Sequence, residues 1–292
     1  MSNPKITIIG AGKVGGALAV LLKERGYPVF GVASKRYESA LELAALVGGS
    51  AFTTPEEAAR GAGLIFITTP DREIENVSRR ISERGGVSPG AIVAHTSGAH
   101  PSDCLAGVRE RGGLAISIHP LQSFADLKTA MENIPGSFFA LEGDREAMPV
   151  AERLVEDLEG RVFHIEAGNK VLYHAAACIA SNYLVSLMRL STGLLEGLGL
   201  SAKDSFQALL PLVQGTINNI EKVGPVQALT GPVARGDAPT IEGHLPALAE
   251  VGREEETIYR VLGKYTVRVA LEKGSIGPEQ AEILLKKFGE AF

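Results

Sequence analysis

The sequence predicts an α/β protein in two parts: a doubly wound parallel sheet with helices on both faces over residues 1–166, then an all-α region over residues 167–292. Three observations lead to this prediction. Short apolar segments alternate with amphipathic helical segments through the first part, which is the pattern of β-α-β units. A glycine-rich motif follows the first expected strand. After Gly168 the alternation stops and long apolar helices follow.

The first part contains seven segments with the features of buried strands. Most are rich in Ile, Val, Leu, Ala and Phe, and helical segments separate most of them. One such helix begins at Thr54, which can cap it, with Pro55 at the first helical position and Glu57 completing a capping box. The expected strands are KITIIG (5–10), YPVFGVAS (27–34), LIFITTPD (64–71), GAIVAHTSG (90–98), GLAISIHPL (113–121), GSFFALEG (136–143) and RVFHIE (161–166).

The second part is expected to consist of long helices at about 168–198, 202–223 and 244–274, broken by the segments GLGLSAKD and TGPVARGDAPT. Helices this apolar need a surface to cover them. We therefore expect the chain to form a homodimer through its helical part.

Charge and composition exclude several classes of partner. A formal charge of −5 over 292 residues argues against binding nucleic acid or an anionic membrane surface. No apolar run approaches the roughly 18 to 20 residues of a membrane helix, and a strand beginning at Lys5 leaves no room for a secretion signal. Cys104 and Cys178 have no metal-ligand spacing and form no disulfide framework. We expect a cytoplasmic protein with two buried thiols and no metal.

The glycine-rich motif GAGKVG predicts a dinucleotide site. Gly10 permits the tight turn, Gly12 lets a pyrophosphate approach the backbone, and Gly15 lets the helix pack on the strand. Free amides at the N-terminus of that helix would bind the phosphates. The alternative is a purely structural glycine-rich turn, which the strand before it and the helix after it make less attractive. The expected cofactor contacts are Gly10, Ala11, Gly12, Lys13, Val14 and Gly15.

The end of the second expected strand predicts which dinucleotide is bound. An NAD-binding protein has an acidic residue there for the ribose hydroxyls. This chain has Ser34, Lys35 and Arg36 instead. A hydroxyl and a guanidinium bind a 2′-phosphate, whereas a carboxylate would repel it. The sequence thus favours NADP(H), although a solvated helix start would also carry Lys35 and Arg36.

Polar residues end three further expected strands. Ligands of doubly wound sheets bind outside the carboxyl ends of the strands. We therefore expect cofactor contacts from Thr68, Thr69 and Pro70. Ser97 (after Thr96) and His119 are expected to contact substrate, although Ser97 could instead cap its own turn and His119 could be a turn residue. Each alone is weak evidence, but together on one edge they indicate a site.

Lys170 and His174 stand four residues apart at the start of an apolar helix. They therefore share a face, with Cβ atoms about 6 Å apart. A lysine can stabilise a developing oxyanion and a histidine can shuttle a proton at neutral pH. We predict that both are catalytic. The alternative is a solvated lysine beside an interface histidine.

Several motifs together resemble one family across essentially the whole chain: GAGKVG, VASKR, TTPD, SIHPLQSF, GNKVLYHAAACIASNYLV and LTGPVARGD. The family is one of bacterial Rossmann-like NADP-binding proteins with a C-terminal domain of unknown function. The first half is also similar to pyrroline-5-carboxylate reductase, ketopantoate reductase and the deazaflavin-dependent NADP reductases. The wider β-hydroxyacid dehydrogenase superfamily implies an all-helical second domain and a dimer.

The same resemblance bears on the helix that begins near Lys170. Superfamily members place a lysine there with an asparagine four residues later. Lys170 matches the lysine, and His174 stands in the asparagine position. Asn182, about 12 Å further along the helix, does not simply replace that asparagine but is a candidate substrate contact.

The segment TGPVARGDAPTIEGHL (230–245) lies between helices, where pyrroline-5-carboxylate reductase has a substrate loop. Arg235 is the expected anchor for a substrate carboxylate. Asp237 is either a general base or the cap of the next helix.

These features predict an NADP(H)-dependent oxidoreductase for a small carboxylate-bearing carbonyl or imine compound. In such an enzyme the nicotinamide supplies the hydride, and the protein places the substrate and delivers the proton. Two alternatives stay open, because a dinucleotide fold does not by itself imply chemistry. One is a non-catalytic NADP(H)-sensing dimer. The other is hydride transfer between NADP and a deazaflavin.

Overall fold

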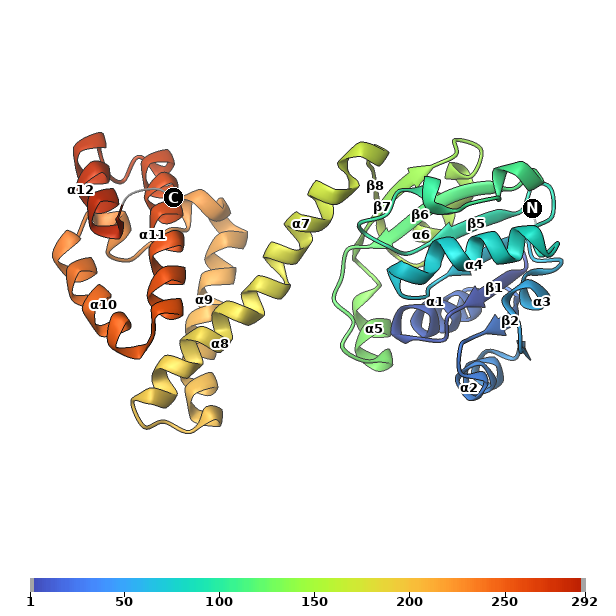
Figure 1. Ribbon diagram of the computed structural model, residues 1–292, viewed down its shortest axis with the longest axis horizontal. Helices are drawn as coiled ribbons and strands as arrows, with labels where there is room; N and C mark the ends of the chain where they lie inside the picture. The colour runs from blue at the N-terminus through green and yellow to red at the C-terminus, as the bar shows by residue number, and fades with distance from the viewer. Residues whose placement is uncertain (1–2, 290–292) are drawn as a thin grey trace. The chain divides into compact units, whose positions relative to one another are not determined.

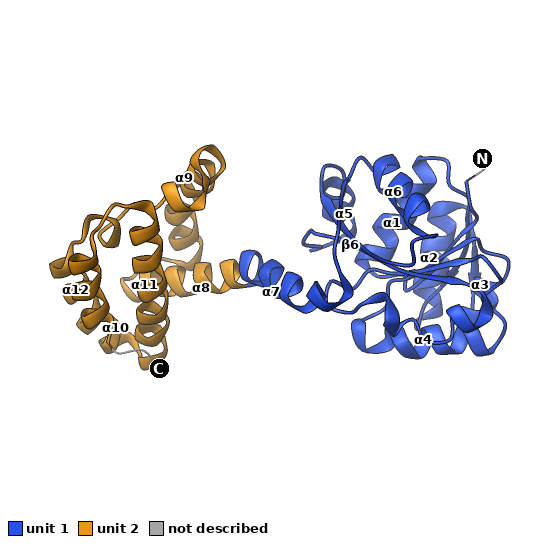
Figure 2. Ribbon diagram, turned by 90° about the horizontal axis from the view of Figure 1, so that it is seen from above, with its two compact units in different colours: residues 1–182 blue, residues 183–292 orange. Residues whose placement is uncertain are grey.

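The structure is a computed structural model that describes residues 3–289. The chain forms two compact units, one ending at Asn182 and the other beginning at Tyr183 (Figure 2). The sequence predicted a boundary after residue 166, before the helix α7 (Lys170–Ala180). This helix belongs to the first unit because the side chains of Lys170 and Tyr173 bond to Ser117 and His119 of the sheet.

The first unit is built on an eight-stranded sheet with the order β3-β2-β1-β4-β5-β6-β7-β8 (Figure 1). The α/β fold class is therefore confirmed, and the six strands from β3 to β6 have the order of a dinucleotide-binding sheet. The strands are β1 (Ile6–Ile9), β2 (Val29–Ala33), β3 (Ser50–Phe52), β4 (Leu64–Ile67), β5 (Ile92–His95), β6 (Leu114–Pro120), β7 (Phe138–Gly143) and β8 (Arg161–His164).

The sheet differs from the prediction at both edges. The short strand β3 was not predicted, because three residues carry no alternation that a sequence pattern could reveal. Strand β7 runs antiparallel to β6, so the sheet is not entirely parallel. The connection between them contains only the seven-residue helix α5 (Leu127–Asn133), about 10 Å long. The amide of Leu121 bonds to the carbonyl of Phe138, which turns the chain back beside β6.

Helices cover both faces of the sheet. One apolar core joins the sheet to α1 (Lys13–Glu24), α2 (Tyr37–Val47), α5 and α6 (Met148–Asp157). A second core on the other face joins it to α3 (Pro55–Ala59) and α4 (Asp71–Glu83). Strand β4 is apolar throughout because both of its faces are covered, and in β1 only Thr7 is polar, with its hydroxyl bonded to the carbonyl of Ala58. The carboxyl ends of the strands are left for polar residues.

The second unit is helical. Its helices are α8 (Asn182–Gly197), α9 (Ala202–Gln227), α10 (Ala238–Val251), α11 (Arg253–Lys273) and α12 (Pro278–Phe288). A separate core lies among the last three, around Ile241, Val267, Leu284 and Phe288. The single helix expected at 244–274 is in fact two, because the backbone is extended at Gly252 and an acidic first turn starts α11 there. The helix α12 was not predicted.

Residues 167–197 form one helical stretch that is long and apolar enough to cross a membrane, with a mean hydropathy of 1.4 in its most apolar window. None of that window is buried. The expectation that no run of this kind exists is therefore wrong as to length and composition. This stretch is not evident in the sequence, because polar residues interrupt its apolar runs: Lys170, Ser181, Asn182 and Arg189.

Candidate functional site

The glycine-rich turn joins β1 to α1, and its three glycines differ in their surroundings. Gly10 has a φ of +116°, which favours glycine, and a Cβ there would lie 2.7 Å from the Thr68 carbonyl. A Cβ on Gly15 would lie 2.1 Å from the Gly10 oxygen, so this position must stay bare for the helix to approach the strand. A Cβ on Gly12 would meet nothing within 4 Å. Gly12 is therefore not needed for packing.

The start of α1 can accept an anionic ligand. Gly12 is the N-cap and provides no side chain to bond the first amides of the helix. Ala11, Lys13 and Val14 stand half-buried or exposed around it. The free amides and the open backbone at Gly12 fit a pyrophosphate, as the spacing of the motif indicated.

The end of β4 lies against this turn. The hydroxyl of Thr68 donates to the carbonyl of Gly10 over 2.7 Å and so holds the turn in place. The hydroxyl oxygen of Thr69 is buried and has no hydrogen-bond partner among residues 3–289. A buried hydroxyl without a partner is costly, so a bound molecule at this edge would satisfy it. Pro70 is exposed and precedes α4.

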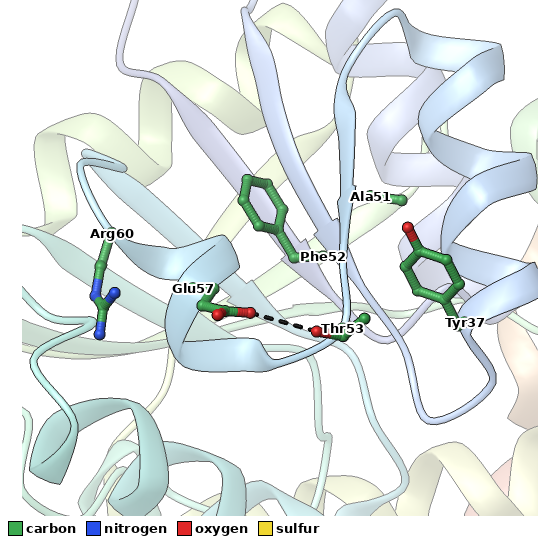
Figure 3. Close-up of a pocket in the computed structure, with 6 residues that line it drawn as sticks. All are labelled: Tyr37, Ala51, Phe52, Thr53, Glu57 and Arg60. Carbon is green, nitrogen blue, oxygen red and sulfur yellow. Dashed lines mark hydrogen bonds between the residues drawn. The ribbon is translucent and has the colours of Figure 1, made fainter.

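The residues predicted to bind a 2′-phosphate stand at the end of β2. Ser34 is half-buried, Lys35 and Arg36 are exposed, and one guanidinium nitrogen of Arg36 lies 3.0 Å from the hydroxyl of Ser39. No acidic residue stands among these three. Tyr37, which follows Arg36, lines a hollow of about 420 Å³ together with Ala51, Phe52, Thr53, Glu57 and Arg60 (Figure 3).

The turn after β5 is held by Ser97. Its hydroxyl donates to the carboxylate of Asp71 over 2.8 Å and accepts from the amides of Ala99 and His100. Because its one proton is used, the Ser97 hydroxyl cannot also donate to a substrate. The turn interpretation that the sequence left open is therefore the arrangement in the structure.

His95 also stabilises this turn through both of its ring nitrogens. Its Nδ1 accepts from the amide of Ser97, and its Nε2 lies 3.3 Å from the carbonyl oxygen of Pro101. Burial, together with the charge of Lys170, lowers the pKa of His95 to about 3. A neutral imidazole with the proton on Nε2 satisfies both contacts. His95 is thus a structural residue under the turn.

Lys170 is fully buried. Its ammonium donates to the carbonyl of Ser97 over 2.9 Å and to the hydroxyl of Ser117 over 2.5 Å. Within residues 3–289 no carboxylate lies within 4.0 Å of it. Burial lowers its pKa to about 8, although the more distant Glu142 opposes the shift. The predicted lysine is therefore enclosed beneath the carboxyl edge of the sheet, not presented at its surface.

His119, Tyr173, His174 and Gly98 come together above this lysine. Nδ1 of His119 lies 2.6 Å from the hydroxyl of Tyr173, and the rings of His119 and His174 are 6.4 Å apart. A Cβ on Gly98 would lie 2.8 Å from Nε2 of His119 and 2.7 Å from Cδ2 of His174. Both imidazoles therefore pack directly against the α-carbon of Gly98, and a larger residue there would displace them.

The sequence did not single out Tyr173 or Gly98. Tyr173 stands three residues after Lys170 and so lies on nearly the same helix face, which is the signal that was available. Gly98 has an ordinary φ, and only the closeness of the two imidazoles explains it. No sequence pattern carries that information.

The remaining predicted residues lie elsewhere. Asn182 is exposed at the start of α8. Arg235 is exposed in a short 3-10 helix, with Nη2 3.9 Å from Oδ2 of Asp237. Asp237 accepts from the amide and hydroxyl of Thr240, so it caps α10, which was one of its two predicted roles. A substrate role for Asn182, Arg235 or Asp237 stays a prediction.

The cysteines and metal ligands were also predicted. Both thiols are free and half-buried, not fully buried as expected. Burial raises the pKa of Cys104 to about 11. The Sγ of Cys178 lies 3.9 Å from Nδ1 of His174. No group of three or more His, Cys, Asp or Glu able to hold a metal occurs in the part of the chain that the structure describes.

Comparisons with known proteins agree with this architecture. Residues 2–120 match the Rossmann-like domain, and residues 137–266 match the Domain of unknown function (DUF2520). The predicted combination of a Rossmann-like domain and a C-terminal domain of unknown function is therefore confirmed. The second match begins at β7, so it includes the last two strands of the sheet as well as helices.

Solved structures resemble nearly the whole chain. A Bacteroides fragilis protein proposed to be an NADP oxidoreductase is 25% identical, with a TM-score of 0.76 over 91% of this chain and 99% of that one. A Thermotoga maritima protein is 29% identical, with a TM-score of 0.73 over 92% and 99%. A reductive aminase from Aspergillus terreus, solved with NADPH and ethyl-5-oxohexanoate, is 19% identical. Its TM-score of 0.65, over 96% and 98% of the two chains, shows the shared fold.

Curated relatives match only in part. Glutamyl-tRNA reductase of Methanopyrus kandleri is 30% identical over 164 residues, which are 54% of this chain and 37% of that protein. The same enzyme of Methanothermobacter marburgensis is 29% identical over 124 residues, or 42% and 31%. The chain spans about a third of the length of the curated relatives it matches.

Proposed function

We propose that the protein is an NADP(H)-dependent oxidoreductase acting on a small carbonyl or imine compound that carries a carboxylate. The observation that carries the proposal is the convergence of His119 and His174 on the α-carbon of Gly98, with their ring centroids 6.4 Å apart. This cluster lies at the carboxyl edge of the sheet, as does the glycine-rich turn. Two imidazoles that converge at this edge can act on a reacting carbonyl or imine.

The residues around the glycine-rich turn and at the end of β2 have the chemistry that NADP(H) requires. The open backbone at Gly12 and the uncapped amides of α1 suit a pyrophosphate, and the unpartnered hydroxyl of Thr69 suits a polar ligand group. Ser34 and Arg36 suit a 2′-phosphate, and the absence of an acid among residues 34–36 favours NADP(H) over NAD(H). The reductive aminase of similar fold binds NADPH, which supports the same choice.

The two histidines would have separate roles in the reaction. The cofactor supplies or accepts the hydride. Burial, with Lys170 and His174 nearby, lowers the pKa of His119 to about 3. His119 is therefore a neutral hydrogen-bond donor that would polarise the carbonyl oxygen or imine nitrogen. His174 would deliver the proton that this atom takes up, because an imidazole can act as a general acid.

Lys170 receives a different role from the one predicted. Its ammonium is enclosed and bonded to Ser97 and Ser117, so it would not touch the substrate in this arrangement. We propose that it fixes the turn carrying Gly98 and that its charge keeps His119 neutral. Lys170 is then a positioning residue, and His119 and His174 are the catalytic pair.

The test is NADPH oxidation with a panel of keto acids, aldehydes and cyclic imines. Gly98→Ala places a Cβ against both imidazoles and displaces them, so it should abolish turnover while NADPH binding stays within about twofold of wild type. Gly197→Ala is the matched control, because a Cβ there meets nothing within 4 Å, the φ is not positive and the residue lies outside the site. Full activity of Gly98→Ala with a turned-over substrate would refute this site.

The enclosure of Lys170 also favours one of the alternatives, a non-catalytic NADP(H) sensor, because a buried lysine contributes no chemistry at the surface. A sensor predicts that no compound in the panel is reduced. It also predicts that NADPH shifts the association equilibrium of the protein by more than about tenfold, measured by analytical ultracentrifugation.

A further inference from the structure

The hydrogen bond between His119 and Tyr173 determines which nitrogen of His119 carries its proton. The two rings meet edge to face, with centroids 5.5 Å apart, and Phe163 packs on the far side of Tyr173 at 5.7 Å. The contact joins Nδ1 of His119 to the phenol oxygen over 2.6 Å. Either group could donate, and the surroundings decide between the two arrangements.

If Nδ1 of His119 were protonated, two groups would be left without partners. The phenol proton would need another acceptor, and within residues 3–289 no other group makes a hydrogen bond with the Tyr173 hydroxyl. Nε2 would also need a donor, and no described residue donates to it. If the phenol donates to Nδ1 instead, only the proton on Nε2 is left over. Buried polar groups favour the arrangement with fewer unsatisfied members.

The ionisation of both groups agrees with this arrangement. Burial raises the pKa of Tyr173 to about 12, so the phenol keeps its proton at neutral pH. Burial, with the charges of Lys170 and His174, lowers the pKa of His119 to about 3. His119 thus carries a single proton across the physiological range. With Nδ1 accepting from the phenol, that proton is on Nε2.

Nε2 is the nitrogen that faces Gly98 at the carboxyl edge of the sheet. It is the atom that a Cβ on Gly98 would meet at 2.8 Å, opposite the edge of His174. We propose that Tyr173 is a positioning residue that locks His119 in the Nε2–H form, so that His119 presents a hydrogen-bond donor to the acceptor atom of the substrate. This inference rests on the proposed function for its purpose, but the tautomer itself can be measured without any substrate.

The experiment is nitrogen-15 NMR of the intact protein labelled at histidine, because protonated and unprotonated ring nitrogens have well separated shifts. His119→Gln assigns the signal by its disappearance. In wild type at pH 7 the proton should be on Nε2. In Tyr173→Phe, which keeps the edge-to-face contact with Phe163 but removes the hydroxyl, a substantial share should move to Nδ1.

The chain offers a matched control. Tyr259 and His244 form the same pair in the helical unit, with the phenol oxygen 2.7 Å from Nδ1 and centroids 5.8 Å apart. Tyr259→Phe removes the same kind of hydrogen bond and should leave His119 unchanged. With a substrate in hand, Tyr173→Phe should lower kcat by about 10- to 1,000-fold with KM nearly constant, because a misplaced proton affects the reacting atom.

Two results would overturn the inference: a proton on Nδ1 of His119 in wild type, or the same tautomer and kcat in Tyr173→Phe as in Tyr259→Phe. Failure of the proposed function looks different. In that case the tautomer would shift as expected in Tyr173→Phe, but no carbonyl or imine in the panel would be reduced by wild type.

Discussion

The ammonium of Lys170 lies 2.9 Å from the carbonyl oxygen of Ser97, and the lysine has no solvent exposure. A buried ammonium that meets only a carbonyl and a hydroxyl is poorly compensated. This relationship links the first turn of α7 to the turn after β5, and thereby to the two histidines. It also makes the stability of the protein depend on pH in a direction that can be calculated.

Lys170→Met should change that dependence. The pKa of Lys170 is lowered to about 8 in the folded protein, from 10.5. Between these values the unfolded chain holds the proton and the folded chain does not, so this lysine makes stability rise with pH. The difference in the free energy of unfolding, wild type minus variant, should therefore increase by up to about 3 kcal/mol from pH 8 to pH 10.5. Urea unfolding measures it, with the exposed Lys203→Met as control. A difference that does not change with pH would contradict the burial of the charge.

His119 should make the stability of the protein depend on pH in the acid range. Its folded pKa of about 3 lies below the ordinary 6.5, so only the unfolded chain binds the proton between these values. The contribution of this group to stability is then lost as pH falls from 6.5 towards 3. Wild type should lose more stability over that range than His119→Gln. Parallel urea titrations at pH 7 and pH 4 provide the comparison, and equal losses would show that His119 ionises normally.

The two glycines Gly12 and Gly15 should respond in opposite ways to a methyl group. Gly15→Ala places a Cβ 2.1 Å from the Gly10 oxygen, so it should lower the melting temperature by several degrees or prevent folding. Gly12→Ala meets nothing within 4 Å and should fold normally. We expect it instead to weaken NADPH binding by more than tenfold, because the methyl would meet the pyrophosphate. Calorimetric melting with and without NADPH separates the two effects. Normal NADPH binding by Gly12→Ala would contradict the assignment of the turn.

The helical unit should mediate dimerisation. Several apolar side chains on α9 are exposed, including Leu210 at 45% and Leu212 at 67%. Exposed apolar patches of this kind mark interfaces. We predict a homodimer at micromolar concentration by sedimentation equilibrium, dissociated by Leu212→Asp but not by Leu46→Asp, which lies on α2 and is 60% exposed. A monomeric wild type would refute the homodimer.

The sequence predicted the parts of the fold that local patterns specify. Buried strands, the GAGKVG turn and the cap at Thr54 each follow from a few neighbouring residues, and the Thr54 hydroxyl does accept from the amide of Glu57. The antiparallel strand β7 and the break at Gly252 depend on contacts between distant segments. No periodicity records such contacts.

The candidate site shows the same limit. His119 and His174 were predicted because of their residue type and position. Their convergence depends on Gly98, which comes from another strand end. Lys170 was noticed for its charge, but its enclosure by Ser97 and Ser117 arises only from tertiary structure. The sequence could draw attention to these residues by their type, but not to the contacts that each one makes.

Everything proposed for the site depends on whether the fold holds NADP(H). A parallel titration with NADPH and NADH, followed by the cofactors' own fluorescence, tests it most directly, and the chain contains no tryptophan to interfere. Wild type should bind NADPH at least about tenfold more tightly than NADH, and Arg36→Ala should lose most of that preference. Equal binding of the two cofactors, or binding of neither, would contradict the account.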